Sequence, residues 1–225
     1  MTKKLLTICI LAGCISAQDE RLRLKRADVL ENRTINGEAV QFLTGNVVFQ
    51  KKDMTLFCDR ARYRQKKGLG MLVGSVRVTR DDQTLTCDSL HINSPDDILT
   101  GYGRAHAWTD AYDLTSDTLL YFSESDSGSA MGDVTLIQEG QTITAEKIAD
   151  VESRSSEGVS YSAHQNVVIQ DSLRTATCGV AHYNKDEEKT LLKIKPKVVQ
   201  KGQTISGKEI SLHYKEGELE FVFIP

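Results

Sequence analysis

The chain has 225 residues, of which 40% are hydrophobic and 26% charged, a composition typical of a globular protein that is long enough for a large core. Three prolines exclude a proline-rich linker. The formal net charge is −3, and no basic run could follow a phosphate backbone, so we expect no nucleic-acid partner.

Residues 1–17 have the pattern of an export signal. Lys3 and Lys4 form a basic start, an apolar stretch runs from Leu5 to Ala12, and small residues follow. This stretch is too short to span a bilayer, which needs about 20 apolar residues. We therefore expect export to the periplasm and a single domain over residues 26–225.

Leu11-Ala12-Gly13-Cys14 within this signal resembles a bacterial lipobox. Two alternatives remain open. Either Cys14 is lipidated and anchors the protein to a membrane, or the signal is cleaved after Ala17 and Cys14 is lost.

Six consecutive copies of one unit fill the rest of the chain. The residues that open each unit are separated by 29, 29, 29, 33 and 29 positions: Gly45, Gly74, Gly103, Gly132, Gln165 and Ile194. The residues that close the common motif keep the same steps: Asp59, Asp88, Asp117, Glu146, Gly179 and Lys208. The four extra residues of the longer step fall in the polar segment 153–158, where a loop can lengthen at little cost.

Apolar and polar residues alternate within each unit, which predicts three half-buried strands per unit and no helix. Turn residues such as Lys52-Asp53 and Glu139-Gly140 separate the first strand from the second. The segments Arg26–Val29 and Gly217–Ile224 are expected to be half-units that begin and end the stack. Because one unit cannot bury its apolar face alone, the units must stack around a shared interior.

The inward positions predict a groove wall, and the candidate binding residues come from the first two strands of each unit: Val47, Phe49, Leu56, Val76, Val78, Leu85, Leu114, Val134, Leu136, Ile143, Val167, Ile169, Val198 and Ile205. A filled core is the competing interpretation. Many inward residues are short, which we interpret as leaving room for a guest molecule.

Cys58, Cys87 and Cys178 share one inward position with Ser116, Ala145 and Gly207, which favours a small apolar wall residue over a metal ligand. A disulfide between Cys58 and Cys87 is the alternative, since an exported protein meets an oxidising environment.

Catalytic motifs are absent from the sequence. The five histidines lack metal-ligand spacing, there is no GxSxG elbow, and the repeated Asp59, Asp88 and Asp117 suit a structural role. We expect no enzymatic activity, no cofactor and no metal site.

The repeated motif resembles the OstA-like family of lipopolysaccharide-transport proteins, which includes LptA, LptC and the N-terminal domain of LptD. The resemblance rests on Gly45–Val48 followed by Met54–Ala61, repeated as Gly74–Val76 with Gln83–Asp88, and it covers residues 26–225. The opening glycine is missing from the fifth and sixth units, and the lipobox is not typical of LptA.

The resemblance implies an all-β, twisted, half-open β-jelly-roll (β-taco) of stacked units. It also implies an interior that carries the acyl chains of lipopolysaccharide or a related amphiphile between the inner and outer membranes. Partners implied in the same way are other OstA-like modules joined through end strands, the inner-membrane ABC transporter and the outer-membrane translocon, with self-association through the same strands.

Two other functions fit a stacked β repeat. One is a polysaccharide-processing enzyme on a parallel β-helix, although the outward residues Asn46, Arg77, His106 and Thr135 form no cluster of acids or bases. The other is a structural subunit of a cell-surface filament.

Overall fold

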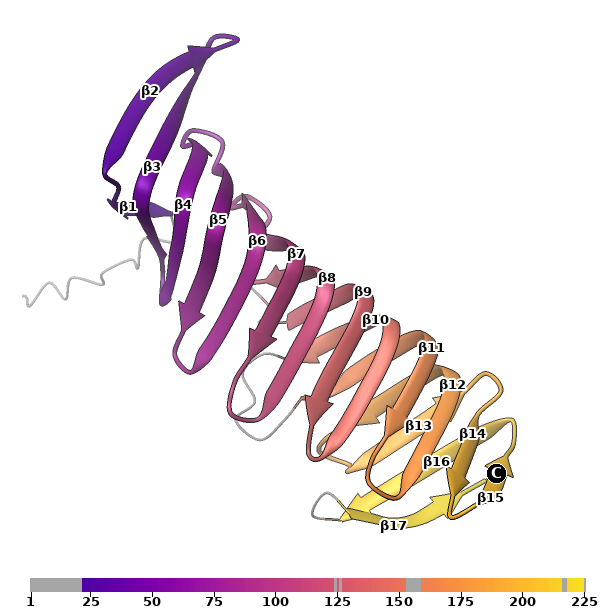
Figure 1. The fold of residues 1–225 in the computed structure, drawn as a ribbon. Coiled ribbons are helices and arrows are strands. Elements are labelled where there is room, and N and C mark those ends of the chain that lie inside the picture. The colour runs from indigo at the N-terminus through magenta and orange to yellow at the C-terminus, as the bar shows by residue number, and fades with distance from the viewer. Residues whose placement is uncertain (1–21, 124, 126, 153–158, 216–217, 225) are drawn as a thin grey trace, which may run out of the picture.

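The protein is a long, folded stack of β-strands with its N-terminal and C-terminal strands at opposite ends (Figure 1). The computed structural model describes residues 22–123, 125, 127–152, 159–215 and 218–224. The predicted export signal and the lipobox-like segment with Cys14 lie outside these residues. No helix long and apolar enough to cross a membrane is found in the described part of the chain.

The described residues form seventeen strands, and most of those in the middle are 10 to 14 residues long. In chain order they are β1 (Arg23–Arg26), β2 (Val29–Ile35), β3 (Glu38–Lys51), β4 (Met54–Arg64), β5 (Leu69–Arg80), β6 (Gln83–Asn93), β7 (Ile98–Trp108), β8 (Tyr112–Phe122), β9 (Ser127–Gln138), β10 (Gln141–Glu152), β11 (Tyr161–Gln170), β12 (Arg174–Asn184), β13 (Lys189–Lys193), β14 (Lys197–Gln200), β15 (Gln203–Ser206), β16 (Glu209–Lys215) and β17 (Glu218–Phe223).

The strands form one antiparallel meander from β2 to β12, in which each strand pairs with the next. At the two ends a pair of short strands takes the place of one long strand. Thus β1 and β2 both pair with β3, and β13 and β14 both pair with β12. These antiparallel ladders confirm the jelly-roll prediction and overturn the alternative of a parallel β-helix.

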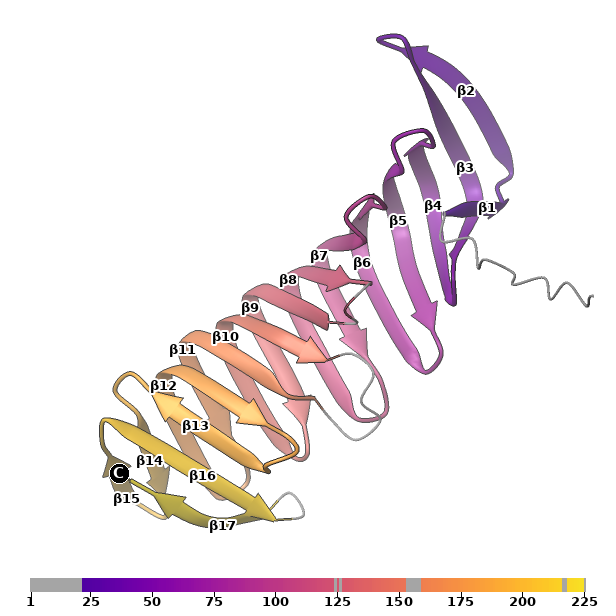
Figure 2. The ribbon, with the colours of Figure 1, turned by 180° about the vertical axis from the view of Figure 1, so that it is seen from behind.

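Each long strand bends near its middle, so that the sheet folds into two walls. Pairing of β3 with β4 is interrupted between Thr44 and Val47, and every following pair up to β11 with β12 has a similar break. We call the line of breaks the seam. Wall A contains β2, residues 38–44, 60–64 and 69–73 and their equivalents, and wall B contains β1, residues 47–51, 54–58 and 76–80 and their equivalents. From behind, the two walls are visible as two layers (Figure 2).

The bend corrects one detail of the predicted strands. The second and third strands predicted in each unit are the two halves of a single strand, such as β4 on either side of Asp59 and Arg60. Both residues are exposed, and the inward alternation resumes one position later at Ala61. The predicted turns at Lys52-Asp53 and Glu139-Gly140 and the strand at the C-terminal end are present.

A repeated pair of residues creates the seam. Gly74 has a φ of +81° and Ser75 a φ of +45°, a left-handed pair that turns the strand sharply. A Cβ placed on Gly74 would lie 2.5 Å from Oδ2 of Asp59 on the preceding strand, and Ser75 Oγ donates a hydrogen bond of 3.0 Å to the same oxygen. The repeated aspartates thus have a structural place beside the glycine.

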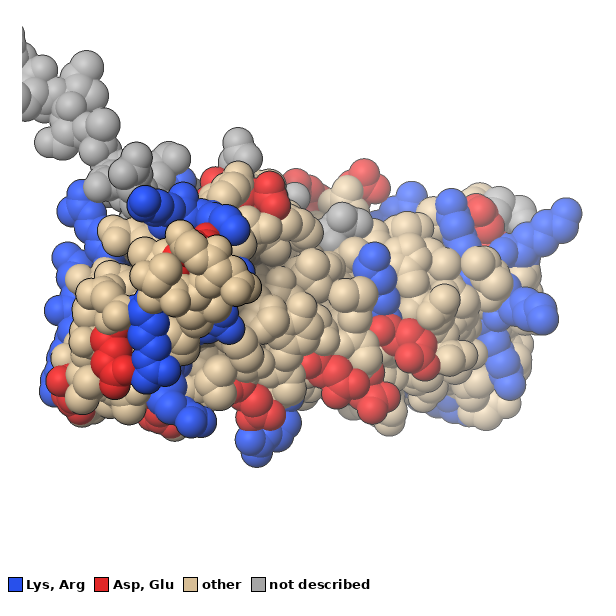
Figure 3. Space-filling model, turned by 90° about the horizontal axis from the view of Figure 1, so that it is seen from above, with Lys and Arg blue, Asp and Glu red and all other residues tan. Residues whose placement is uncertain are grey.

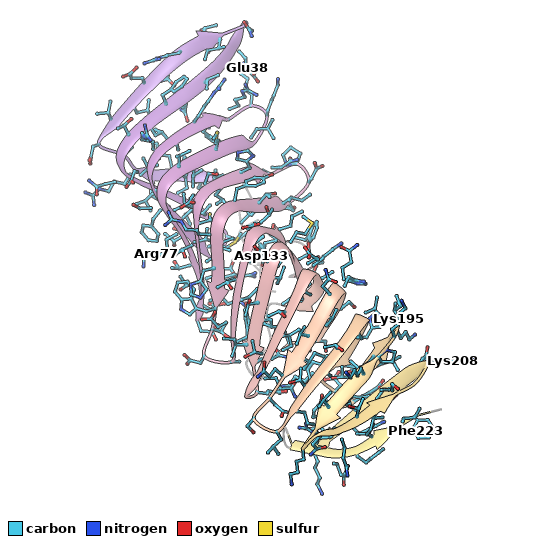
Figure 4. All side chains as sticks on the ribbon, turned by 45° about the vertical axis from the view of Figure 1, so that its right-hand side comes forward. Glu38, Arg77, Asp133, Lys195, Lys208 and Phe223 are labelled. Atoms are coloured by element: carbon cyan, nitrogen blue, oxygen red, sulfur yellow. The ribbon has the colours of Figure 1, made fainter. Side chains whose placement is uncertain are left out.

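Hydrogen bonds equivalent to that of Ser75 with Asp59 recur along the seam, and one lies at its N-terminal end. Asn46 donates to Asp28 at 2.7 Å, and Arg104 donates to Asp88 at 2.5 Å. Asp133 and Lys195, both labelled in Figure 4, are the second left-handed residues of later units, with φ of +43° and +54°. The seam therefore runs from β1 and β2 to β13 and β14.

The sixth unit reaches the same geometry with its residues exchanged. Ile194 stands where the first four units have glycine and has a φ of +62°, which is costly for a β-branched residue. Gly179 stands opposite, where the first units have aspartate, and a Cβ there would lie 2.7 Å from Cγ2 of Ile194. The glycine of this pair therefore lies on the neighbouring strand, and its missing side chain leaves room for Ile194.

We expect Gly132→Ala to destabilise the protein strongly, because Gly132 has a φ of +78° and its Cβ would lie 2.5 Å from Oδ2 of Asp117. Gly140→Ala is the matched control, since its φ is +71° but nothing lies within 4 Å of its Cβ. The control should lose about 1–2 kcal/mol from backbone strain alone, and Gly132→Ala at least about 1 kcal/mol more. Urea denaturation measures both, and equal losses would contradict the role given to the seam.

Candidate functional site

The fourteen predicted groove residues all point into the space between the walls, and all belong to wall B. Twelve of them are buried, with Phe49, Leu56, Leu136 and Ile143 at 0% exposure. The other two, Leu85 and Ile205, are partly buried and pack against the same cluster. The structure therefore brings the predicted residues together along one continuous apolar surface.

Wall A supplies the opposite half of this interior, and half of its inward positions were missed by the sequence reasoning. Leu43, Leu72, Ala130, Ala163 and Leu192 are at most 1% exposed. They lie in segments that were treated as connections between units. Their numbers, with Gly101 in the third unit, follow the same steps of 29 and 33 residues, so the repeat itself could have located them.

The space between the walls is closed in this structure. A cavity of about 80 Å³ remains, lined by apolar side chains that include Val78, Leu85, Leu114 and Leu119. It is smaller than an apolar cavity of about 150 Å³ that binds one benzene molecule. An acyl chain could enter only if the walls moved apart.

Short inward residues beside the seam leave no room for a guest, whereas others, such as Gly101 and Ala107, line the cavity. Cys58, Ser116 and Cys178 lie directly beside the seam, where the two walls meet. All three are buried, at 4%, 7% and 9% exposure. Small side chains at this position permit close approach of the walls and do not create a cavity.

The cysteine thiols in the described part of the chain are free: Cys58, Cys87 and Cys178. No disulfide joins Cys58 to Cys87. Burial raises the pKa of each thiol to about 11. These residues therefore serve as small wall residues and do not form the alternative disulfide.

The two walls are not connected by the backbone at the edge opposite the seam. We call this edge the open edge, and polar residues line it. They form what we call the rim column, which follows the 29-residue step along wall B: Lys51, Arg80, Thr109, Gln138, Asp171 and Gln200. Lys51 is 1%, Gln138 4% and Arg80 8% exposed. A polar residue at an inward position of every unit was a signal that the sequence analysis did not use.

The rim column contacts wall A across the open edge in the N-terminal half. Lys51 Nζ lies 2.5 Å from Asp97 Oδ1 and 3.4 Å from Ser123 Oγ. Arg80 donates to Asp53 at 2.6 Å and to the hydroxyl of Tyr121. The hydrogen bond from Lys51 holds the pKa of Asp97 below its usual value. Asp97, Ser123 and Tyr121 come from wall A or its loops, so these contacts join the walls.

The C-terminal half is joined in a similar way with fewer charges. Gln138 accepts from the backbone N–H of Val159 at 3.0 Å and donates to its carbonyl at 3.1 Å. Tyr183 donates a hydrogen bond of 2.8 Å to Glu139, and Lys185 lies 3.4 Å from the same carboxylate. Parting the walls would break one such polar contact after another.

We also searched the described residues for clusters that could bind a metal ion. Within residues 22–224, as far as they are described, no group of three or more His, Cys, Asp or Glu side chains could hold a metal ion. His106, for example, lies 3.0 Å from Asp113 and stacks on Trp108. The described residues thus offer an apolar interior with a polar rim.

Comparison with known proteins gives one matching family model and 15 similar chains of solved structures. A family model described as "LptA/(LptD N-terminal domain) LPS transport protein" matches residues 58–218. The crystal structure of LptH from Pseudomonas aeruginosa, described as the LptA homologous periplasmic component of the lipopolysaccharide transport device, is 22% identical, with a TM-score of 0.42 over 44% of this chain and 76% of LptH. No curated protein matches the chain. The family match runs from the first repeat unit to the last.

Proposed function

Because the chain belongs to the LptA/LptD N-terminal-domain family of lipopolysaccharide transport proteins, we propose that it carries lipopolysaccharide with the acyl chains held between its two walls. This family consists of transport proteins, so the chain is not an enzyme. The observation that supports binding is the continuous apolar interior, which is shared by all six units. At the open edge, side-chain contacts of the rim column close this interior. Each Å² of acyl chain buried there would contribute about 25 cal/mol.

The binding surface in this proposal includes both walls. On wall B it comprises the fourteen predicted residues, among them Val78 and Leu136, and on wall A it comprises the facing column that contains Leu43 and Leu72. The sugar part of the amphiphile would remain in water at the open edge. We place the protein in the periplasm, in keeping with the export signal and with the description of LptH. Anchoring through Cys14 remains a proposal about residues that the structure does not describe.

The end strands are the proposed sites for partner modules. On β2, Val29 is 50% and Leu30 44% exposed, and on β17, Phe221 is 51% and Phe223 55% exposed. Phe223 lies at the C-terminal end of the stack (Figure 4). An end strand also offers unpaired N–H and C=O groups to which another strand can add. We propose that related OstA-like modules extend the stack at these strands, toward the inner-membrane ABC transporter at one end and the outer-membrane translocon at the other.

Charge favours a different module over a second copy at these ends. Residues 22–67 contain 11 Lys and Arg against five Asp and Glu, a net +6, and residues 189–225 contain seven against four, a net +3. Residues 68–188 contain seven against 20, a net −13. In Figure 3 blue side chains accordingly gather toward both ends and red ones between them. Two basic ends repel each other, so a partner with an acidic end fits better than self-association.

Photo-crosslinking in cells tests the proposed function. A photoreactive amino acid at Val78 or Leu136, which are 7% and 0% exposed, should capture lipopolysaccharide. Matched controls are Arg77 and Thr135, which precede these residues and point out of the same strands; Arg77 is visible outside the ribbon in Figure 4. Capture from the outward positions alone would contradict the proposal. Purified protein that polymerises but binds no amphiphile would instead favour the filament subunit.

A further inference from the structure

Two cations lie buried at neighbouring positions of the rim column. Lys51 and Arg80 are 1% and 8% exposed, and each ends the first strand of its unit. The later members of the column are uncharged or acidic: Thr109, Gln138, Asp171 and Gln200. Positive charge is therefore concentrated where the open edge passes over the first two units.

The carboxylates that neutralise these cations reach them from the solvent side. The side chain of Asp97, which lies 2.5 Å from Lys51, is 25% exposed, and that of Asp53, which lies 2.6 Å from Arg80, is 40% exposed. Another anion could replace either carboxylate from the solvent side, whereas the buried cations could not remain without an anion. The site thus keeps its cations fixed, and its anions are open to exchange.

Apolar space adjoins Arg80 directly. Arg80 and Tyr121 line the cavity between the walls together with Val78, Leu85 and Leu114. If an acyl chain separates the walls, Asp97 and Tyr121 on the wall A side move away from Lys51 and Arg80 on wall B. An anion attached to the acyl chains would then occupy the position left beside the two cations.

We propose that Lys51 and Arg80 form a binding site for the phosphate group of the amphiphile, next to the acyl chains held between the walls. The proposal rests on the proposed function and adds the headgroup chemistry to it. A guanidinium and an ammonium group suit a phosphate, which accepts several charge-assisted hydrogen bonds. The resident Asp53 and Asp97 compete with the phosphate and close the site when no amphiphile is bound.

The test compares the affinity of the full-length protein for lipopolysaccharide and for the same lipopolysaccharide with its phosphates removed. We expect the wild type to bind the phosphorylated form about tenfold more tightly. The variant Lys51→Met/Arg80→Met should bring this ratio close to one and still bind the dephosphorylated form. Gln138→Met, a change at an uncharged position of the same column, should leave the ratio unchanged.

A second variant changes the ratio in the opposite direction and does not require removal of a buried cation. Asp97→Asn removes a competing anion and should raise the preference for the phosphorylated form by about threefold or more. An unchanged ratio in Lys51→Met/Arg80→Met, or a lowered ratio in Asp97→Asn, would overturn the phosphate site.

The remaining outcomes separate the phosphate site from the proposed function. Equal binding of both forms to the wild type overturns the site alone, whereas binding of neither form overturns the proposed function and the site with it. Saturable binding of inorganic phosphate alone, lost in Lys51→Met/Arg80→Met, would reassign the cations to a free ion and overturn their role toward the amphiphile.

Discussion

Replacing Leu136 by Asp is expected to cost at least about 4 kcal/mol of folding free energy, because it places an unpaired carboxylate in the apolar interior. Leu136 is 0% exposed and faces Leu114 and Ile143 on the neighbouring strands. No cation of the rim column lies on the adjoining strand ends, where Gln138 and Gln141 stand. The midpoint of urea denaturation measures the loss.

Ile137→Asp is the matched control, since Ile137 is the next residue on β9, points outward and is 46% exposed. It should cost about 1 kcal/mol or less, chiefly through the lower strand preference of Asp. Similar losses at the two positions would mean that the interior is as wet as the outer face, and the distinction between inner and outer residues would not hold.

The three buried thiols are expected to react far more slowly than an exposed one. With a pKa of about 11, only about one thiol in a thousand is ionised at pH 8, against roughly a quarter at the ordinary pKa of about 8.5. Since only the thiolate attacks a disulfide reagent, ionisation alone should slow labelling by at least about 100-fold. Limited access between the walls slows it further.

Labelling with a disulfide reagent in a Cys9→Ser/Cys14→Ser variant measures this protection, because only Cys58, Cys87 and Cys178 then remain. An added Ile137→Cys provides the exposed reference on the same molecule. Three slow thiols and one fast thiol are the expected pattern, and addition of urea should make all four fast. Native thiols as fast as the reference, or a titration of fewer than three in urea, would contradict buried, unpaired cysteines.

The repeat made the stacked β architecture predictable from sequence, because its columns report the local environment of each position. Val47, Val76 and Val134 are small and apolar at equivalent places, and all three are 1% exposed. What the pattern could not show is the fold of the sheet. The break in alternation after Cys58 indicates a strand end as readily as a bend, since a bulge and a turn both change which face a residue occupies.

The same ambiguity explains why half of the inward positions of wall A were missed. Leu72 lies shortly before Gly74, and without the bend its segment reads as a connection between units. The size of the interior is equally hidden from sequence, because it depends on the angle between the walls at the seam. Short side chains such as Cys58 and Ala145 fit both a wide groove and two walls in contact, and the structure shows walls in contact.

The rim column could have been predicted from the repeat, but its role could not. Lys51, Arg80 and Gln138 stand at one repeat position, and a polar residue at the end of a strand is ordinarily solvated. Their partners Asp97, Tyr121 and Val159 lie 21 to 46 residues away. Only the folding of wall A over wall B brings these residues together.

Nuclear Overhauser effects between the acyl methylenes of bound lipopolysaccharide and isotope-labelled methyl groups of the protein would show directly where the chains lie. We expect contacts to Leu136, Ile143 and Val167 of wall B and to Leu72 of wall A, with none to Ile137 on the outer face. Contacts confined to outward methyl groups, with the inward ones unchanged, would contradict binding between the walls.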